Sequence, residues 1–476
     1  MAAGKGCGMT ITASGRSSGV SMLILACVLA LPVAGGCSQA GVTGAVPENP
    51  AGGGAGTPST QPNQGRAGLD LTQLLVWAKQ DHSEIVRRGA TSNYRMVQTY
   101  YDRSGRRIDD LKLGYLFHGV WWCQFEISEG LVRVDSDDER NLIGYADTAG
   151  RVVIPFQYYS AAPFHDGRAV VAVNDSNDYR KRKGGLIDRQ GQWVVPAGEY
   201  KELKFAGQGR WKFQIPAARR GEAIVKTDIE DKDDGLWGYL DANGSAVVKP
   251  VLFSAGRVDD GVSVVSDANE AWIMDLRGKK AGELPDSLYA AEDFSCGRAL
   301  VSILTGKQKP ARVGIFGSTG ATQRDFRDGF IDRRGKMVIP ARYIAAGSFT
   351  EGLAPVSNSK GARFTDSEDE QFSSAVDDPE HADPNQRWGF IDTEGRLVIP
   401  MKFDQVSQFR EGLARARQGR KWGFIDRTGT FVVPPVYEWV MSFGNGVAMV
   451  VKDGMIFLVD KKGKVIVNTG SGYAVF

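Results

Sequence analysis

Short runs of hydrophobic residues, interrupted at intervals by aspartate and glycine, dominate the chain from residue 144 onward. The run WGFID from Trp388 is followed by Thr393, Glu394, Gly395 and the apolar run LVIP. An aspartate can start a tight turn and a glycine can adopt a positive φ within it, so the two runs are predicted to form a hairpin. Both runs are apolar on both faces, which indicates sheets covered on both sides by neighbouring units.

This hairpin pattern recurs along the chain. Close copies start at Gly329, Trp388 and Trp422, weaker copies at Gly144, Leu186, Trp237 and Trp272, and a last half copy at Ile456. The turn aspartates Asp392, Asp426 and Asp460 are 34 residues apart, which is the shortest period. Such a period is typical of arrays in which each repeat is one supersecondary unit. The turn residues of the three close copies are therefore expected to be structural: Asp332, Gly335, Asp392, Gly395, Asp426 and Gly429.

One half of the repeat is nearly constant in length and the other half varies. A second glycine, in a segment like EGLA at 351–354, follows the turn glycine after 17 to 19 residues. From that glycine to the next turn aspartate the distance ranges from 14 to 40 residues. Insertions at one position of a repeat emerge on one face of the array, so we expect this loop-bearing face to carry the function.

The predicted fold class is all-β. Three or four short strands per repeat fit a closed or nearly closed β-propeller of seven to eight short blades, or an open, solenoid-like β array. The segment EGLVRV at 129–134 is predicted to supply the strand that the last half copy lacks, which would close a ring of eight. The segment YYDRSGR at 100–106 resembles a further degenerate hairpin and argues against closure.

The repeat resembles the WG repeat family of bacterial proteins over residues 144–467. The copies at Gly329, Trp388 and Trp422 match the family pattern closely, whereas the copy at Trp272 lacks both the glycine after tryptophan and the VIP run. The family consists mainly of repeats of unassigned function in envelope and secreted proteins. The resemblance therefore implies a fold and a location more than an activity.

The N-terminal segment indicates export. Lys5 and Arg16 precede the apolar run at 22–33, which is too short to span a bilayer as a mature helix. AGGC at 34–37 resembles a bacterial lipobox, which implies removal of residues 1–36 and attachment of lipid to Cys37; the alternative is a plain secretory signal with an incidental cysteine. We expect a lipoprotein held in the bacterial cell envelope, at the outer membrane.

Between the lipid site and the repeats we expect a linker and a helix. Residues 37–68 are poor in large apolar side chains and rich in Gly, Pro, Ser and Thr, which is typical of a flexible linker. A helix is expected at 69–90, with Asp70 as its N-cap and Gly89 at its end. Its apolar face would comprise Leu71, Leu74, Leu75, Ala78 and Ile85. A degenerate β segment at 91–143, the repeat domain at 144–467 and a tail at 468–476 complete the predicted organisation.

Net charge and cysteine content limit the possible partners and the possible disulfide bridges. The net charge of +2 includes two leader residues, so the mature chain is close to neutral, which speaks against nucleic acid as a partner. Of five cysteines, Cys7 and Cys27 leave with the leader and Cys37 carries lipid. Cys123 and Cys296 form either one bridge or two separate thiols.

Catalytic motifs are not found. The sequence contains no HExxH, GxSxG, P-loop or dinucleotide-binding motif, and its four histidines, His82, His118, His165 and His381, lie in unrelated contexts. No catalytic residue, metal or cofactor is predicted. The tryptophans Trp237, Trp388 and Trp422 are expected to pack between units. A hydrolase or lyase that uses two carboxylates stays an alternative, because residues that meet only in three dimensions leave no spacing signature.

The insertions carry the candidate binding residues. Segments 228–234 and 366–383 are acidic, while 179–183 and 307–327 are mostly basic. The candidates are Arg180, Arg182, Asp228, Asp231, Asp233, Asp369 and Glu370. We expect a non-enzymatic envelope lipoprotein that binds a protein or an envelope polysaccharide through these loops; a purely structural envelope protein is a further alternative. Deletion of residues 361–386 is expected to leave thermal stability nearly unchanged.

Overall fold

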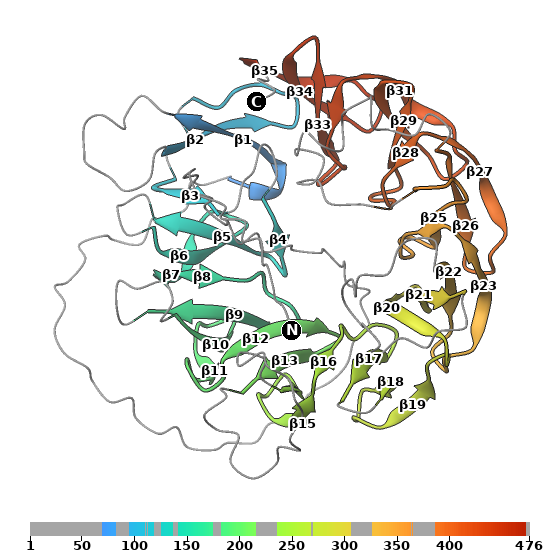
Figure 1. Cartoon of the computed structure of the whole chain (residues 1–476). Helices are drawn as coiled ribbons and strands as arrows, with labels where there is room; N and C mark the ends of the chain where they lie inside the picture. The colour runs from blue at the N-terminus through green and yellow to red at the C-terminus, as the bar shows by residue number, and fades with distance from the viewer. Residues whose placement is uncertain are drawn as a thin grey trace, which may run out of the picture. The chain divides into compact units, whose positions relative to one another are not determined.

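A computed structural model describes residues 69–81, 95–109, 111, 113–118, 125–136, 141–174, 182–215, 236–267, 270–305, 326–362, 364 and 386–472. Within these ranges the chain is all-β except for one 3-10 helix. The strands form the eight blades of a β-propeller and one additional two-stranded hairpin (Figure 1). The propeller prediction is confirmed, with eight blades, and the open array is wrong.

The first strands of the chain form the hairpin and blades 1 to 3. The helix η1 (Leu71–Gln73) precedes the hairpin strands β1 (Leu74–Asp81) and β2 (Arg95–Asp102). Blade 1 comprises β3 (Tyr115–Phe117), β4 (Ile127–Ser128), β5 (Leu131–Ser136), β6 (Ile143–Asp147) and β7 (Val152–Tyr158). Blade 2 comprises β8 (Ser160–Ala161), β9 (Arg168–Val173), β10 (Lys183–Asp188) and β11 (Trp193–Val195). Blade 3 comprises β12 (Glu202–Gly207), β13 (Arg210–Gln214), β14 (Trp237–Leu240) and β15 (Ala246–Leu252).

The remaining strands form blades 4 to 8. Blade 4 comprises β16 (Ser254–Ala255), β17 (Val262–Ser266), β18 (Ala271–Asp275) and β19 (Lys280–Glu283). Blade 5 comprises β20 (Leu288–Ser295), β21 (Arg298–Leu304), β22 (Phe326–Ile331) and β23 (Met337–Tyr343). Blade 6 comprises β24 (Ala345–Ala346), β25 (Leu353–Ser357), β26 (Trp388–Asp392) and β27 (Leu397–Phe403). Blade 7 comprises β28 (Gln405–Val406), β29 (Ala414–Gln418), β30 (Lys421–Ile425) and β31 (Phe431–Tyr437). Blade 8 comprises β32 (Trp439–Val440), β33 (Val447–Lys452), β34 (Met455–Asp460) and β35 (Val465–Gly472).

Every blade from 2 to 8 is an antiparallel meander of four consecutive strands. The connections therefore alternate between two ends. We call the end with the connection between second and third strands the insertion end. The opposite end carries the D-x-x-G turn between third and fourth strands and a two-residue turn between first and second strands, and we call it the turn end.

The ring closes differently from the way the sequence suggests. The segment at 129–134 does not complete the last blade, because β5 pairs with β6 in blade 1 and blade 8 has all four strands of its own. Instead the hairpin β1–β2 packs between the two. Leu75 and Tyr101 join the core of blade 8 with Trp439, while the Gln98 side chain donates to the carbonyl of Phe117 in blade 1 at 2.8 Å. The repeat-like YYDRSGR segment thus contributes to closure of the ring.

The helix expected at 69–90 is wrong. Asp70 does cap a helical turn, since its carboxylate accepts from the Thr72 amide at 3.0 Å, but that turn is only the 3-10 helix η1. The chain then continues as β1, which pairs along its whole length with β2. Pairing with β2 and burial of Leu74, Leu75 and Val76 on both faces outweigh the helical spacing of the leucines. Ile85 and Gly89 lie outside the described residues.

The glycine of the WG pair is required by close approach of two strands. A Cβ atom on Gly389 would lie 2.4 Å from the carbonyl oxygen of Ile399, in the VIP run of the adjacent fourth strand. The same carbonyl contact recurs at Gly144, Gly185, Gly238, Gly329 and Gly423. The pairing of β26 with β27 is irregular at this point, which is typical of a bulge. In blade 4, where Trp272 replaces this glycine, the fourth strand β19 is short.

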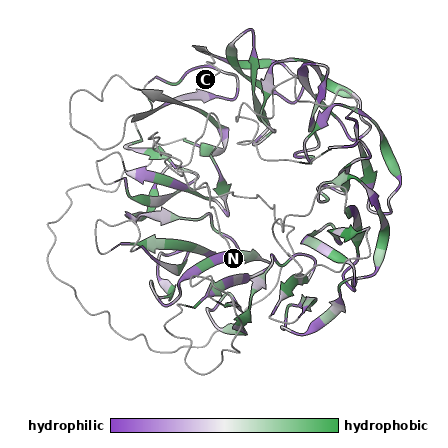
Figure 2. Ribbon diagram, viewed as in Figure 1, coloured by the Kyte–Doolittle hydropathy of each residue, from purple (hydrophilic) through white to green (hydrophobic). Residues whose placement is uncertain are grey.

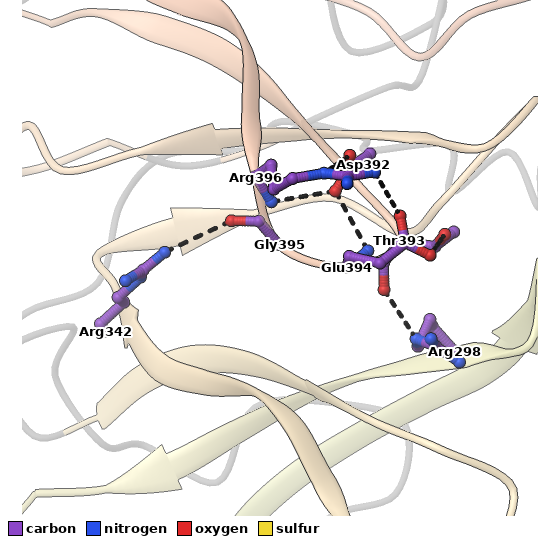
Figure 3. Close-up of polar contacts among 7 residues, drawn as sticks. All are labelled: Arg298, Arg342, Asp392, Thr393, Glu394, Gly395 and Arg396. Atoms are coloured by element: carbon purple, nitrogen blue, oxygen red, sulfur yellow. Dashed lines mark hydrogen bonds and ion pairs between the residues drawn. The ribbon is translucent and has the colours of Figure 1, made fainter.

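The D-x-x-G turns repeat one set of hydrogen bonds. In blade 6 the Asp392 carboxylate accepts from the amides of Glu394 at 3.1 Å and Arg396 at 2.9 Å, and Gly395 has φ +82° (Figure 3). Asp332 and Asp426 accept from their equivalent amides. Such a turn with glycine in the left-handed region sets the hairpin register.

A basic side chain bridges every seam between consecutive blades at the turn end. It comes from one of two repeat positions. Arg168, Arg210 and Arg298, each directly after the second glycine, donate to a turn carbonyl of the next blade: that of Ala242, Leu276 and Thr393 respectively. At the other seams the residue after the turn aspartate reaches back to the two-residue turn of the preceding blade: Arg189, Arg333, Arg427 and Lys461. Arg103 of the hairpin does the same toward Asn445 of blade 8.

The fourth strands form the outer edge of the sheets. All large hydrophobic side chains that are exposed in the described ranges lie on them, including Leu397 and Val398 of β27. Figure 2 shows hydrophobic segments on β27 along this outer edge. Pro400 also lies on this edge and is exposed. A proline cannot donate to an added strand, so it protects the edge from pairing with another chain.

Candidate functional site

The insertion end is the candidate binding surface, because the three longest connections between described strands, those after β13, β21 and β25, leave from it. The connections after β9, β13, β21 and β25 each join a second strand to a third strand. Most residues of these four insertions lie outside the described ranges, but the strand ends from which they leave are described. Three of these ends carry an aromatic ring: Trp237 in blade 3, Phe326 in blade 5 and Trp388 in blade 6. In blade 2, Tyr159 lies just before β8, beside the insertion residue Arg182.

Trp237 is the centre of the most polar of these positions. Lys204 and Lys212 are cross-strand partners on β12 and β13, so both side chains lie on the same face of blade 3. Their ammonium groups lie 5.7 and 5.5 Å from the centre of the Trp237 ring. Glu202 pairs with Lys204 at 3.0 Å. The tryptophan itself is half-buried, so part of the ring is accessible beside two cations.

Lys212 connects this position to a row of polar groups that crosses blades 4 to 6. Its ammonium donates to the carbonyl of Ala255 at 2.8 Å, and burial lowers its pKa, while the nearby Asp293 carboxylate acts in the opposite direction. Asp293 accepts from the Arg257 amide at 2.7 Å. Glu292, the preceding residue, accepts from the Ser348 hydroxyl at 2.5 Å. The row therefore ties neighbouring blades together through charged groups.

Burial affects the acids of this row strongly. The pKa of Glu292 is raised by burial although its side chain remains in contact with solvent, and burial also raises the pKa of Asp293. Asp328 lies at the repeat position of the WG tryptophan and is only 6% exposed. It accepts from Ser302 at 2.7 Å and from the Ala346 amide at 2.9 Å, and burial raises its pKa to about 7.

The base of the blade 6 insertion is part of the core. Ala362 is fully buried, and the Phe364 ring packs on Gly347 and lies 5.6 Å from the Trp388 ring. The Arg387 amide donates to Ser359 at 2.7 Å, which holds the two ends of the insertion together. The segment 361–386 is thus not a uniform loop, because residues 362 and 364 pack with the blade.

The candidate residues named from the sequence are only partly within the described ranges. Arg182 is exposed, and its guanidinium lies 5.9 Å from the Tyr159 ring centre. The other binding candidates lie outside the described residues: Arg180, Asp228, Asp231, Asp233, Asp369 and Glu370. Cys37 and Cys123 also lie outside them, so the structure does not address lipid attachment or a bridge to the exposed Cys296.

The three repeat tryptophans have different surroundings. Trp388 and Trp422 are 2% and 3% exposed and pack in the cores of adjoining blades. Trp237 is more accessible than these two, and two lysines lie beside its ring. Sequence reasoning treated all three alike and missed Lys204 and Lys212; their alternation along 204–214 with apolar residues was the available signal.

The described residues contain neither a cluster of metal ligands nor a membrane-spanning helix. No three His, Cys, Asp or Glu side chains in the described part of the chain come together to hold a metal ion. His118 pairs with Asp135 at 2.6 Å in blade 1, while His165 stacks on Phe205. Within the same ranges, no helix is long and apolar enough to cross a membrane.

Comparison with known proteins identifies the repeat. The model of the WG containing repeat matches residues 143–175, 185–209, 329–360, 388–422 and 422–455. Among curated proteins, none matches this sequence.

Similar solved structures have low sequence identity. A crystal structure of the eukaryotic initiation factor has 7% identity and a TM-score of 0.41, covering 83% of this chain and 94% of that chain. Apo AztD from Citrobacter koseri has 13% identity and a TM-score of 0.28, covering 84% and 96%. The protein lmo1340 from Listeria monocytogenes EGD-e has 10% identity and a TM-score of 0.30, covering 78% and 92%. The five matches of the repeat model and the recurring glycine contact and aspartate turn lead to one conclusion: the chain carries five copies of the WG containing repeat.

Proposed function

We propose that this protein is a non-enzymatic binding module of the bacterial cell envelope, which presents the insertion end of its propeller to a protein or polysaccharide ligand. The observation that carries the proposal is that the three longest connections between described strands, those after β13, β21 and β25, leave from one end of the blades. A ring of blades joined at every seam is a rigid platform, and binding residues are commonly placed on loops held by such a scaffold.

The chemistry at Trp237 supports a ligand with both apolar and anionic character. A half-exposed tryptophan offers an apolar ring face, on which a sugar ring or an aromatic side chain can stack. Lys204 is exposed beside it and can pair with a carboxylate or sulfate of the ligand. Acidic polysaccharides and acidic protein segments both have these features.

Binding of envelope extracts tests the proposal. The mature domain, immobilised, is expected to retain a specific protein or polysaccharide, and Lys204→Glu is expected to weaken that retention at least fivefold. Lys452→Glu, an exposed lysine at the insertion end of blade 8, is the matched control. Equal retention by wild type, Lys204→Glu and the control would contradict a ligand site at Trp237.

Attachment to the membrane through lipid is a separate part of the proposal. It rests on the lipobox-like AGGC before Cys37 and on the linker composition that follows. Cys37→Ser is expected to move the protein from the membrane fraction to the soluble fraction. An unchanged membrane fraction would refute the anchor.

A hydrolase or lyase is the second candidate function, and Glu292 is the observation that favours it. Its carboxyl contacts solvent and has a pKa raised by burial, as a general acid requires. Against this, the Glu292 carboxylate already accepts a hydrogen bond from the Ser348 hydroxyl, and this bond joins blades 5 and 6. Loss of a glycan-cleaving activity in Glu292→Gln, with folding intact, would establish the enzyme.

A further inference from the structure

The turn end of the propeller carries basic side chains without acidic partners. Each D-x-x-G turn has exposed positions directly before and directly after its glycine. In blades 4, 5 and 8 both positions are basic and exposed: Arg277, Lys279, Arg334, Lys336, Lys462 and Lys464. Among the described residues, no ion pair involves any of these six side chains.

The insertion end also carries basic residues, and three of them pair with acids at the same end: Lys204 with Glu202 at 3.0 Å, Arg387 with Asp404 at 2.8 Å and Lys421 with Glu438 at 3.4 Å. At the turn end, acidic side chains of the two-residue turns bind to groups of the next blade. Glu411, for example, accepts from the Gly446 amide at 3.0 Å and pairs with Lys461 at 3.1 Å. The six basic side chains thus have no ion-pair partner among the described residues at the turn end.

Large apolar side chains are also exposed near the turn end, mostly on other blades than the six basic residues. Trp193, Leu397 and Val465 each lie two residues after a turn glycine, and they are 42%, 51% and 47% exposed. Val153 and Val432 lie three residues after theirs and are 45% and 40% exposed. An end that exposes lysine and arginine together with tryptophan, leucine and valine has the composition of protein surfaces that lie in the headgroup region of a bilayer.

The described chain also begins at the turn end. Leu69 packs against Gly150 in the turn of blade 1, and the Leu71 amide donates to the carbonyl of Thr148 in the same turn at 2.8 Å. The chain therefore enters the propeller at the turn end.

We infer that the turn end of the propeller docks on an anionic lipid bilayer, with phosphate headgroups bound by the basic residues around the D-x-x-G turns. Equivalent repeat positions lie at the same end of every blade, so the surface suits a flat membrane. The exposed apolar residues favour a bilayer over a soluble polyanion, which offers them nothing to contact. The docked orientation points the insertion end away from the membrane, toward its ligand. This inference does not depend on the lipid anchor.

Vesicle sedimentation of the full chain carrying Cys37→Ser, so that no lipid is attached, tests the inference. Binding to phosphatidylglycerol–phosphatidylcholine vesicles is compared with binding to pure phosphatidylcholine. We expect preference for the anionic vesicles and a decrease in binding at high salt. Lys462→Glu with Lys464→Glu is expected to lower the bound fraction at least tenfold. The apolar leader is common to all variants and affects them equally.

The matched control reverses two exposed basic residues at the insertion end of blades 7 and 8, Arg420→Glu with Lys452→Glu. This control has the same net charge and is expected to bind within twofold of the parent. Equal loss in both double variants, or no loss in either, would overturn the inference. Leu397→Ser is expected to weaken vesicle binding but not binding to dextran sulfate. Retention on dextran sulfate without vesicle binding would show that the surface binds a soluble polyanion and would overturn the inference that it docks on a membrane.

Discussion

The guanidinium of Arg298 donates to the carbonyl oxygen of Thr393, 3.0 Å away, across the seam between blades 5 and 6 (Figure 3). The same seam function is performed at the next interface by Arg427, which lies at the turn position of Thr393 and pairs with Glu351. The two repeat positions are thus alternative sources of one bridge. Each seam uses one of them, and the partner position is then apolar or neutral.

Moving the arginine from one position to the other tests this equivalence. Arg298→Leu removes a charged donor from a partly buried carbonyl and is expected to lower the free energy of unfolding by about 1–2 kcal/mol. Adding Thr393→Arg is expected to recover about half of that loss, because the new guanidinium can reach back to blade 5. Chemical denaturation measures both values. If Thr393→Arg gives the same change with and without Arg298, the positions are independent.

Gly389→Ala tests the close approach of the fourth strand. The added methyl group would meet the carbonyl oxygen of Ile399 at 2.4 Å, so the strand must shift and the variant is expected to lose about 3 kcal/mol or more of stability. Gly184→Ala is the control, since nothing lies within 4 Å of its added Cβ atom. Thermal unfolding compares the two. Similar melting temperatures would contradict the packing reason for the WG glycine.

Asp328→Asn tests the buried carboxyl at a tryptophan position. Its pKa is about 7 in the folded protein and near 3.8 when unfolded, so the folded state binds the proton more tightly. The stability that this group contributes is present below about pH 4 and is lost as the pH rises through 7. Asparagine can make the same two hydrogen bonds without a charge. The free energy of unfolding of Asp328→Asn relative to that of wild type is therefore expected to increase by on the order of 2–3 kcal/mol as the pH rises from 5 to 8.

Denaturation at several pH values measures this difference, and all other titrating groups are common to both proteins. Parallel pH profiles of wild type and variant would show that Asp328 is not protonated in the folded state near neutral pH.

Two deletions in blade 6 separate the insertion from its base. Replacement of residues 366–385 by a short Gly-Ser linker is expected to leave the melting temperature within a few degrees of wild type, because Ala362 and Phe364 remain packed. Deletion of 361–386 also removes these two residues and is expected to cost about 3–5 kcal/mol. Equal stability of both variants would mean that Phe364 contributes little to the core.

The sequence by itself determined the repeat, its hairpins and the position of the insertions. These depend on local chemistry: Asp392 and Gly395 close a turn whatever lies around them, and the WGFI run of the third strand is covered on both sides as predicted. The same prediction is wrong for the LVIP run, because Leu397 and Val398 are exposed at the outer edge. The repeat count predicted seven to eight blades. The position of the insertions in the chain also fixed the end of the blades from which they leave.

Only the tertiary structure decided how the ends of the chain close the ring. Leu71, Leu74 and Leu75 have the spacing of one helical face, but pairing of β1 with β2 buries Leu74 and Leu75 on opposite sides of a strand. The seam bridges, the lysines around Trp237 and the raised pKa of Asp328 depend on contacts between neighbouring blades. The unpaired positive charge at the turn end likewise depends on which acids the ring itself uses. Sequence spacing records what a repeat does within itself, whereas these features arise where one repeat meets the next.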